Sequence, residues 1–252
     1  MTDGPAIDCR GLVKDFSVGL RGVRVRALDR LDLRVEAGEI YGLLGANGSG
    51  KSTALKLIVG LQTPTAGECR LFGRPSGATA ARASLGYLPD AVEFPDYLTG
   101  RELVQFHAAL AGVDRRERVT RTAAVLHETG MAAAADRRVR NYSRGMKQRL
   151  GLAQALVHDP ELLVLDEPMA GLDPIAAAEW ETLLLRLKAV GKTVLLTSHL
   201  LAGVTRICDR VGLLHRGRML REGRVDALLD ERDGGPRSLE EVFRECATSA
   251  AP

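Results

Sequence analysis

Gly45-Ala46-Asn47-Gly48-Ser49-Gly50-Lys51-Ser52-Thr53 is the stretch that decides the fold of this chain of 252 residues. It matches the pattern G-x-x-x-x-G-K-[ST], in which glycines let backbone N–H groups turn inward around phosphate oxygens. The apolar residues 40–44 before it predict a short buried strand, and residues 51–61 after it predict a helix. The positive N-terminal end of that helix would face the same anion. The sequence therefore predicts a phosphate-binding loop between a strand and a helix.

Three side chains of this phosphate loop (residues 45–53) have expected roles toward a bound nucleotide. Lys51 is expected to reach the β- and γ-phosphates. Ser52 is expected to place its hydroxyl on Mg²⁺, and Thr53 to contact the α-phosphate. A glycine-rich turn without a ligand is the alternative, and the order strand, loop, helix argues against it.

A second apolar strand is predicted at 162–165, and two acids, Asp166 and Glu167, follow it directly. Parallel sheets place their ligand sites at the carboxyl ends of strands. Asp166 is therefore expected to hold Mg²⁺ through water, and Glu167 to position or deprotonate an attacking water molecule. The alternative is that these carboxylates only cap the next helix.

The first third of the chain is predicted to consist of strands and turns. Apolar and polar residues alternate at 7–13 and 27–35, which is typical of half-buried strands. The Gly- and Arg-rich residues 17–26 between them are expected to form a hairpin loop. A turn is expected at 36–39, just before the strand that leads into the phosphate loop.

After the strands of the first third, the chain is predicted to contain a helical region and then alternating strands and helices. Residues 99–135 have helical spacing, and Thr99 with Glu102 three residues later forms a capping-box pattern. The last region alternates short apolar strands with helices, which predicts a parallel sheet covered by helices. Its expected strands are 162–165, 194–197 and 211–214, and its expected helices are 176–187, 200–207 and 238–245.

Composition and charge narrow the possible classes of function. The formal net charge of +3 is too small to argue for a nucleic-acid partner. The four cysteines, Cys9, Cys69, Cys208 and Cys246, are far apart in sequence, so we expect reduced thiols rather than a zinc site or disulfides. No run approaches the roughly 20 apolar residues that cross a bilayer, and no apolar signal-peptide run is visible. For work at a membrane, another chain is expected to supply the spanning helices.

Tyr142-Ser143-Arg144-Gly145-Met146-Lys147-Gln148-Arg149 precedes the strand of Asp166 and resembles the L-S-G-G-Q signature of ABC ATPases with its basic continuation. Residues 142–146 are called the signature segment below. Ser143 and Gly145, which contact phosphate in that family, are kept. Tyr142, Arg144 and Met146 replace Leu, Gly and Gln. A Ser and a Gly at a helix N-terminus make a second anion site, which the phosphate loop does not need.

Three further features follow the order of the same family. The loop 170–173, ending in Asp173, resembles the loop that crosses the dimer interface. His199 follows a predicted strand and resembles the switch histidine that senses the γ-phosphate. Phe16 lies where the family has an aromatic residue that stacks on adenine, with a simple core Phe as the alternative.

One position departs from the family pattern. Residues 86–90 resemble the loop that normally ends in Gln, whose side chain approaches Mg²⁺ and the attacking water. Here that residue is Asp90, which is one methylene shorter and charged. Its carboxylate is a hard oxygen ligand of the kind that Mg²⁺ prefers. We expect Asp90 to belong to the ATP and metal site, with an ordinary loop acid as the alternative.

The resemblance covers residues 7–243 as a single ABC ATPase domain. It implies an α/β fold with a P-loop NTPase (RecA-like) core and an N-terminal antiparallel β subdomain. An α-helical subdomain is expected to be inserted in the core at about 93–158, and residues 217–252 to form a short C-terminal extension. The implied cofactors are ATP and Mg²⁺.

The resemblance also implies ATP hydrolysis coupled to transport, with Lys51, Glu167 and His199 as catalytic residues. Two subunits would form a head-to-tail dimer, with each ATP between the phosphate loop of one and the signature segment of the other. A separate multi-helix permease would hold this cytoplasmic protein on the cytoplasmic face of the cell membrane. Residues 95–102 and 238–243 resemble an exporter branch that includes antibiotic-resistance and sodium-export ATPases.

Three other functions stay open at this stage. ABC ATPases that act on ribosomes or DNA usually have two nucleotide domains or a long coiled-coil insertion, and this sequence shows neither. A P-loop kinase or GTPase would leave the signature segment unexplained, and no N-K-x-D guanine motif occurs. A binding-only regulatory subunit is disfavoured by Glu167 and His199, whereas Asp90 and the altered signature segment keep it open.

Overall fold

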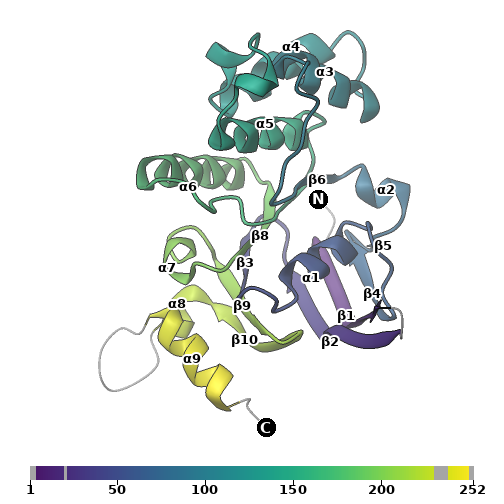
Figure 1. Cartoon of the computed structure of the whole chain (residues 1–252), viewed down its shortest axis with the longest axis vertical. Helices are drawn as coiled ribbons and strands as arrows, with labels where there is room; N and C mark the ends of the chain where they lie inside the picture. The colour runs from purple at the N-terminus through teal and green to yellow at the C-terminus, as the bar shows by residue number, and fades with distance from the viewer. Residues whose placement is uncertain (1–3, 20–21, 230–237, 250–252) are drawn as a thin grey trace.

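The structure is a computed structural model that describes residues 4–19, 22–229 and 238–249. Figure 1 shows two sheets in the lower half of the molecule and a group of helices at the opposite end from the C-terminus. One sheet has four strands in the order β2-β1-β4-β5, and the other has six in the order β10-β9-β3-β8-β7-β6. The arrangement is the α/β fold that the sequence predicts, with an antiparallel sheet beside a mostly parallel one.

The four-stranded sheet is antiparallel and contains the N-terminal hairpin. The pairing of its first two strands continues out to Val18 opposite Val23, so the predicted loop at 17–26 is too wide. Val23 and Val25 are exposed. An alternation of apolar and polar residues identifies a strand only where one of its faces is buried, so that pattern does not reveal this part of the hairpin. Residues 20–21 lie outside the described residues. The strands are β1 (Ile7–Val18), β2 (Val23–Val35), β4 (Ala66–Leu71) and β5 (Arg74–Pro75).

The six-stranded sheet carries the phosphate loop. β9, β3, β8, β7 and β6 are parallel to one another, and β10 pairs antiparallel with β9 at the edge. β3, β7 and β8 are buried along their whole length, as expected of parallel strands covered on both faces. The strands are β3 (Ile40–Leu44), β6 (Leu85–Leu88), β7 (Leu162–Leu165), β8 (Thr193–Ser198), β9 (Arg210–His215) and β10 (Arg218–Arg224).

The predicted strands at 162–165, 194–197 and 211–214 are confirmed, whereas the sequence patterns do not indicate β4, β5, β6 or β10. Residues 86–88, expected in a loop, belong to β6. β6 is only four residues long and contains a glycine, and β10 is an edge strand whose residues are half-buried or exposed. Short and edge strands lack the long apolar run that identifies a central strand, which explains why they are missed.

The helices that the sequence predicts lie at the expected positions, but their lengths differ from the predicted ones. The helix after the phosphate loop ends three residues before 61, and the helix predicted at 200–207 is a single turn. The helices are α1 (Lys51–Ile58), α2 (Thr79–Arg82), α3 (Gly100–Leu110), α4 (Arg118–Glu128), α5 (Arg144–Leu156), α6 (Pro174–Ala189), α7 (Leu201–Val204), α8 (Val225–Leu229) and α9 (Leu239–Ser249), with 3₁₀ turns η1 (Ala132–Ala134) and η2 (Val139–Asn141).

Helices α3, α4 and α5 pack against one another at the top of the view in Figure 1. The predicted capping box is confirmed: the Glu102 N–H donates to Thr99 Oγ1 at 3.2 Å, and the Thr99 N–H donates to Glu102 Oε2 at 2.8 Å. Such a reciprocal cap satisfies two backbone donors at a helix start.

The predicted domain limits are not tested by the structure. They stay predictions: a domain at 7–243, an insertion at about 93–158 and a C-terminal extension at 217–252. Residues 230–237 and 250–252 of that extension lie outside the described residues.

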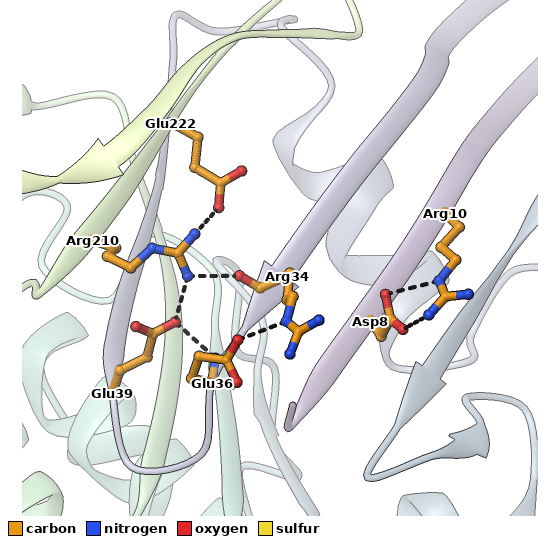
Figure 2. A network of polar contacts seen from close by, with 7 residues as sticks. All are labelled: Asp8, Arg10, Arg34, Glu36, Glu39, Arg210 and Glu222. Atoms are coloured by element: carbon orange, nitrogen blue, oxygen red, sulfur yellow. Dashed lines mark hydrogen bonds and ion pairs between the residues drawn. The ribbon is translucent and has the colours of Figure 1, made fainter. Parts of the chain in front are cut away.

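A half-buried ion network ties the two sheets together near the start of β3 (Figure 2). The Arg210 guanidinium on β9 donates to the Arg34 carbonyl at the end of β2 at 3.0 Å and to Glu39 at 3.1 Å, and it also pairs with Glu222 on β10. The same guanidinium lies 5.5 Å from the centroid of the Tyr41 ring. Burial raises the pKa of the Glu39 and Glu222 carboxyls above their usual range. The network fixes the strand that leads into the phosphate loop.

Candidate functional site

The phosphate loop (residues 45–53) leaves β3 at the carboxyl edge of the parallel strands and leads into α1. The Gly45 N–H donates to the Ser198 carbonyl at the end of β8, at 3.2 Å. Further along the loop, the Ser49 N–H donates to the Ala46 carbonyl at 3.1 Å, and the Ser49 carbonyl accepts from Gly217 at 2.8 Å. The loop is therefore anchored to neighbouring strands on both sides.

Two glycines of the loop are required by close packing. A Cβ on Gly45 would lie 2.3 Å from the Leu214 carbonyl oxygen, which no other residue could tolerate. Gly50 has φ +110°, in the left-handed region, and a Cβ there would lie 2.7 Å from the Ala27 carbonyl oxygen. Gly50 is the N-cap of α1, and within the described residues the first turn of α1 contains no acidic side chain. The N–H groups at this helix start are thus available to an anion.

The Lys51 ammonium is held inside the phosphate loop. Its Nζ donates to the Gly45 carbonyl at 2.7 Å and to the Ala46 carbonyl at 3.3 Å, and lies 3.4 Å from Glu167 Oε1. The side chain is only 6% exposed. A buried cation next to free helix N–H groups provides the positive charge that a phosphate group needs.

The Ser49 hydroxyl gives an independent sign that the loop fits a phosphate. Its Oγ is buried and has no hydrogen-bond partner among the described residues. A buried hydroxyl without a partner costs free energy, about 1–3 kcal/mol in protein mutational data. A phosphate oxygen in the loop would accept from this hydroxyl and remove that cost.

Asp166 lies at the end of β7, beside Ser52 and Thr197. Its Oδ1 accepts from Thr197 Oγ1 at 2.6 Å and from Ser52 Oγ at 3.4 Å. Burial raises the pKa of the Asp166 carboxyl above its usual range, and the nearby Asp90 and Glu167 carboxylates raise it further, while the two hydroxyls lower it. A cation would stabilise the ionised form of such a carboxylate.

The donor set around Asp166 suits Mg²⁺ bound together with a nucleotide. In the described parts of the chain, no cluster of three or more His, Cys, Asp or Glu side chains forms a self-sufficient metal site. Mg²⁺ in nucleotide sites usually takes one or two protein oxygens, with phosphate oxygens and water completing its shell. Ser52 Oγ and the Asp166 carboxylate provide oxygens of that kind, next to the phosphate loop.

Glu167 and His199 face each other across the ends of β7 and β8. Glu167 Oε2 accepts from the His199 N–H at 3.3 Å and lies 2.8 Å from His199 Nδ1. The Glu167 N–H donates to Thr197 Oγ1 at 2.9 Å. Glu167 has φ 50°, a left-handed conformation that is uncommon for a residue with a side chain. Such a conformation persists only where the surroundings enforce it, and it is common at functional sites.

Thr197 is a site residue that the sequence reasoning does not single out. Its hydroxyl donates to Asp166 and accepts from the Glu167 N–H, so it joins the two acids to β8. The available signal is a hydroxyl residue at the end of a strand, two positions before a candidate His. That signal alone is weak, because Ser and Thr are common at strand ends.

Asp90 lies two residues after β6, which pairs directly with the strand of Asp166. The side chain of Asp90 is exposed, and its charge raises the pKa of Asp166. Burial, helped by the charges of Asp166 and Asp90, also raises the pKa of Tyr87 to about 12. The structure therefore brings Asp90 close to the acidic end of the site and leaves its carboxylate free to approach a ligand.

The signature segment lies apart from the phosphate loop, at the start of α5 (Figure 1). Ser143 is the N-cap, and its Oγ accepts from the Met146 N–H at 3.3 Å. Arg144 is exposed, and Gly145 and Met146 are half-buried. A Cβ on Gly171 would lie 3.4 Å from the Arg144 guanidinium, so the segment reaches the loop at 170–173.

Asp173 and Phe16 have local partners. The Asp173 Oδ1 caps α6 by accepting from the Ile175 and Ala176 N–H groups, both at 2.9 Å. Phe16 lies on β1 opposite Val25, with Lys14 Nζ 5.3 Å from its ring centroid. The strand paired with Phe16 is β2, whose Ala27 carbonyl lies close to Gly50 of the phosphate loop. The roles expected for Asp173 and Phe16 stay predictions.

A phosphate loop that opens a helix, with an acidic strand end beside it at the carboxyl edge of a parallel sheet, defines a P-loop nucleotide-binding domain. Comparison with known proteins narrows this class. The family model described as ABC transporter matches residues 28–170. The chain is 40% identical to an uncharacterised ABC transporter ATP-binding protein of Synechocystis, over 84% of this chain and 60% of that protein.

Two further comparisons agree with that match. Nod factor export ATP-binding protein I of Rhizobium sp. (strain N33) is 40% identical over 91% of this chain and 74% of its own length. A dimeric ATP-binding cassette, solved in a post-hydrolysis state bound to ADP and Pi, matches with a TM-score of 0.79 and 25% identity, covering 87% of this chain and 98% of that one. The chain therefore belongs to the ABC transporter family, and its domain is an ABC ATPase domain. It spans about 60% of the length of the first relatives it matches.

Proposed function

We propose that this protein is the ATP-hydrolysing subunit of a transporter, and that it powers export through a separate membrane permease. The observation that carries the proposal is that the Glu167 carboxylate contacts both Lys51, at 3.4 Å, and His199, at 2.8 Å, beside the phosphate loop. A phosphate-binding cation, a carboxylate and an imidazole in one place are the parts that phosphoryl transfer to water requires. The Nod factor export relative supports the direction of transport.

The chemistry proposed for these residues is positioning and charge neutralisation. Lys51 would exchange its contacts with the Gly45 and Ala46 carbonyls for the β- and γ-phosphates of ATP. Glu167 would orient the attacking water and take its proton, with His199 holding the carboxylate in place. Mg²⁺, held by Ser52 and Asp166, would neutralise phosphate charge when bound.

The same proposal includes a head-to-tail dimer. The start of α5 presents exposed Ser143 and half-buried Gly145, and this anion site lies apart from the phosphate loop of the same subunit. A twofold dimer would give each ATP one phosphate loop and one signature segment. The dimeric ATP-binding cassette among the structural neighbours supports this arrangement.

We place the permease contact at a hollow between β6 and α5. Its volume is about 360 Å³, and its walls include Val92, Phe94 and Gln154. Asp90 lies next to it, so a helix seated there would sense changes at the acidic end of the site. No helix within the described residues is long and apolar enough to cross a bilayer. We therefore propose that the protein works on the cytoplasmic face of the membrane through this contact.

Co-purification with a candidate multi-helix permease, co-expressed with this chain, tests the permease contact. A Phe94→Asp variant is expected to lose the partner in detergent, because a charge would line the apolar part of the hollow. Phe106→Asp is the matched control, since Phe106 is exposed on α3 and outside the hollow. Equal recovery of the partner with both variants would rule out this docking site.

Asp90→Ala is expected to weaken ATP hydrolysis and to raise the Mg²⁺ concentration needed for half-maximal activity, by about tenfold in each case. The reason is that its charge acts on Asp166, so its loss removes part of the negative potential that attracts the metal. A Mg²⁺ titration of phosphate release measures both effects. An Asp114→Ala control, exposed in the connection between α3 and α4, should behave like wild type. Unchanged Mg²⁺ dependence and rate in Asp90→Ala would remove Asp90 from the site.

A further inference from the structure

Cys9 on β1 and Cys69 on β4 lie directly opposite each other in the antiparallel sheet. Pairs along these strands alternate between hydrogen-bonded and non-hydrogen-bonded. Phe72 donates to the Ala6 carbonyl at 3.0 Å, which makes that pair hydrogen-bonded. Three positions along, the pair of Cys9 and Cys69 is therefore non-hydrogen-bonded. The Cys69 carbonyl agrees, since it accepts from Ser76 on the other side at 2.9 Å.

This register brings the two sulfur atoms into contact. Opposite residues in a non-hydrogen-bonded pair have Cα atoms about 4.5 Å apart, within the roughly 4.4–6.8 Å range that a disulfide spans. The two Sγ atoms are 2.9 Å apart, with the Cys9 thiol donating to Cys69. The thiols are 2% and 7% exposed, and they lie in the apolar cluster between the antiparallel sheet and α1. Backbone position and side-chain direction thus both suit a covalent bond.

We propose that Cys9 and Cys69 form a redox site, which closes to a disulfide across β1 and β4 when the protein meets a peroxide. The site is separate from the phosphate loop and does not depend on the proposed ATPase function. It also differs from the expectation from sequence spacing, which predicts reduced thiols rather than disulfides. The other two cysteines, Cys208 and Cys246, lie in different parts of the fold and serve as internal controls.

The chemistry needs one equivalent of peroxide. Cys69, the more exposed of the two thiols, loses its proton and attacks a peroxide oxygen, giving a sulfenic acid and one molecule of water. The Cys9 thiol then attacks the sulfenic sulfur, and its proton leaves with the displaced hydroxide as a second molecule of water. Two thiols are oxidised and one peroxide is reduced. The hydrogen bond to Cys69, together with burial, raises the pKa of the Cys9 thiol and keeps it protonated until this second step.

Burial sets the kind of oxidant that can reach the pair. Buried thiols react slowly, because the thiolate is disfavoured and large reagents cannot enter. Hydrogen peroxide is close to water in size, and the slightly exposed Cys69 is the side from which it can approach. A bulky disulfide such as oxidised glutathione is expected to leave the pair reduced over the same time.

Closing the bond is expected to stabilise the protein. The two cysteines are 60 residues apart, and the segment between them contains the phosphate loop. A cross-link over a segment of that length restricts the unfolded chain, and in this domain it should raise Tm on the order of 10 °C. Because the register already places the sulfur atoms in contact, little movement of the strands is needed.

The test is peptide mapping after oxidation of the native full chain with hydrogen peroxide, with free thiols blocked in denaturant and no reductant present. The expected result is a cross-linked peptide pair containing Cys9 and Cys69, a higher Tm, and reversal of both by dithiothreitol. Cys9→Ala and Cys69→Ala should each abolish the Tm rise, and Cys208→Ala and Cys246→Ser should keep it. The peptide map of wild-type protein needs no variant, so it decides the question even where a substitution impairs folding. Recovery of Cys9 and Cys69 as blocked free thiols, or a cross-link that joins other cysteines, would overturn the proposal.

Discussion

Glu167→Gln is expected to slow ATP hydrolysis by about 10²–10⁴-fold, the usual contribution of a positioned general base. The amide keeps the size and hydrogen-bonding capacity of the side chain, and it can still pair with His199. It cannot take a proton from water. ATP affinity should stay within about twofold of wild type, because the phosphate loop and Lys51 are unchanged.

Phosphate release and nucleotide binding, measured on the same preparation, check this prediction. Glu128→Gln on α4 is the matched control, since Glu128 is exposed and lies outside the site. Hydrolysis at the wild-type rate by Glu167→Gln would remove Glu167 from the chemistry. Loss of ATP binding with loss of hydrolysis would show that Glu167 acts on binding instead.

Lys51→Ala is expected to weaken ATP binding by on the order of 100-fold, and to abolish hydrolysis with it. The buried ammonium is the only Lys or Arg charge that the described structure places inside the phosphate loop, between the Gly45 carbonyl and Glu167. Removing one partner of a buried, hydrogen-bonded charge pair costs about 2–5 kcal/mol of binding free energy. A 100-fold loss of ATP affinity corresponds to about 3 kcal/mol, which lies within that range.

Calorimetry with ATP and Mg²⁺ measures the affinity, and phosphate release measures the rate. Lys56→Ala is a matched control on the same helix, because Lys56 is exposed in the last turn of α1. A Lys51→Ala protein that binds and hydrolyses ATP like wild type would contradict the role given to the loop. Circular dichroism should confirm that both variants are folded, since the Lys51 side chain also bonds two loop carbonyls.

The parts of the site that the sequence predicts are those encoded in short contiguous stretches. The phosphate loop and the acids after β7 each follow a buried strand, so pattern and position together specify them. His199 and Glu167 are 32 residues apart, and their contact follows only because β7 and β8 are neighbours. The family resemblance gives each of these residues a separate role at the nucleotide, and residue spacing alone does not predict that they touch.

The parts that the sequence does not predict depend on contacts between distant segments or on exposed strands. Thr197 is identified as a bridge only when β7 and β8 lie side by side. Cys9 and Cys69 meet because β4 adds to β1, and β4 is too exposed for hydrophobic alternation to reveal it. The sequence likewise predicts a loop for the outer hairpin of β1 and β2, because Val23 and Val25 are exposed there. Long-range register is information that local patterns do not contain.

The central claim is that the phosphate loop is half of a site that a second subunit completes with its signature segment. Light scattering during size exclusion of Glu167→Gln, with and without ATP and Mg²⁺, tests it most directly. A second variant adds Gly145→Glu, which should fold because a Cβ there would lie 3.7 Å from Leu172, an ordinary contact. Its carboxylate would repel the phosphates of ATP at the start of α5. Ala123→Glu, exposed on α4, is the charge control.

We predict that Glu167→Gln is a monomer without nucleotide and a dimer with ATP. We also predict that adding Gly145→Glu keeps it monomeric, and that adding Ala123→Glu does not. A protein that binds ATP and remains a monomer, or a dimer that persists in the Gly145→Glu variant, would contradict the account.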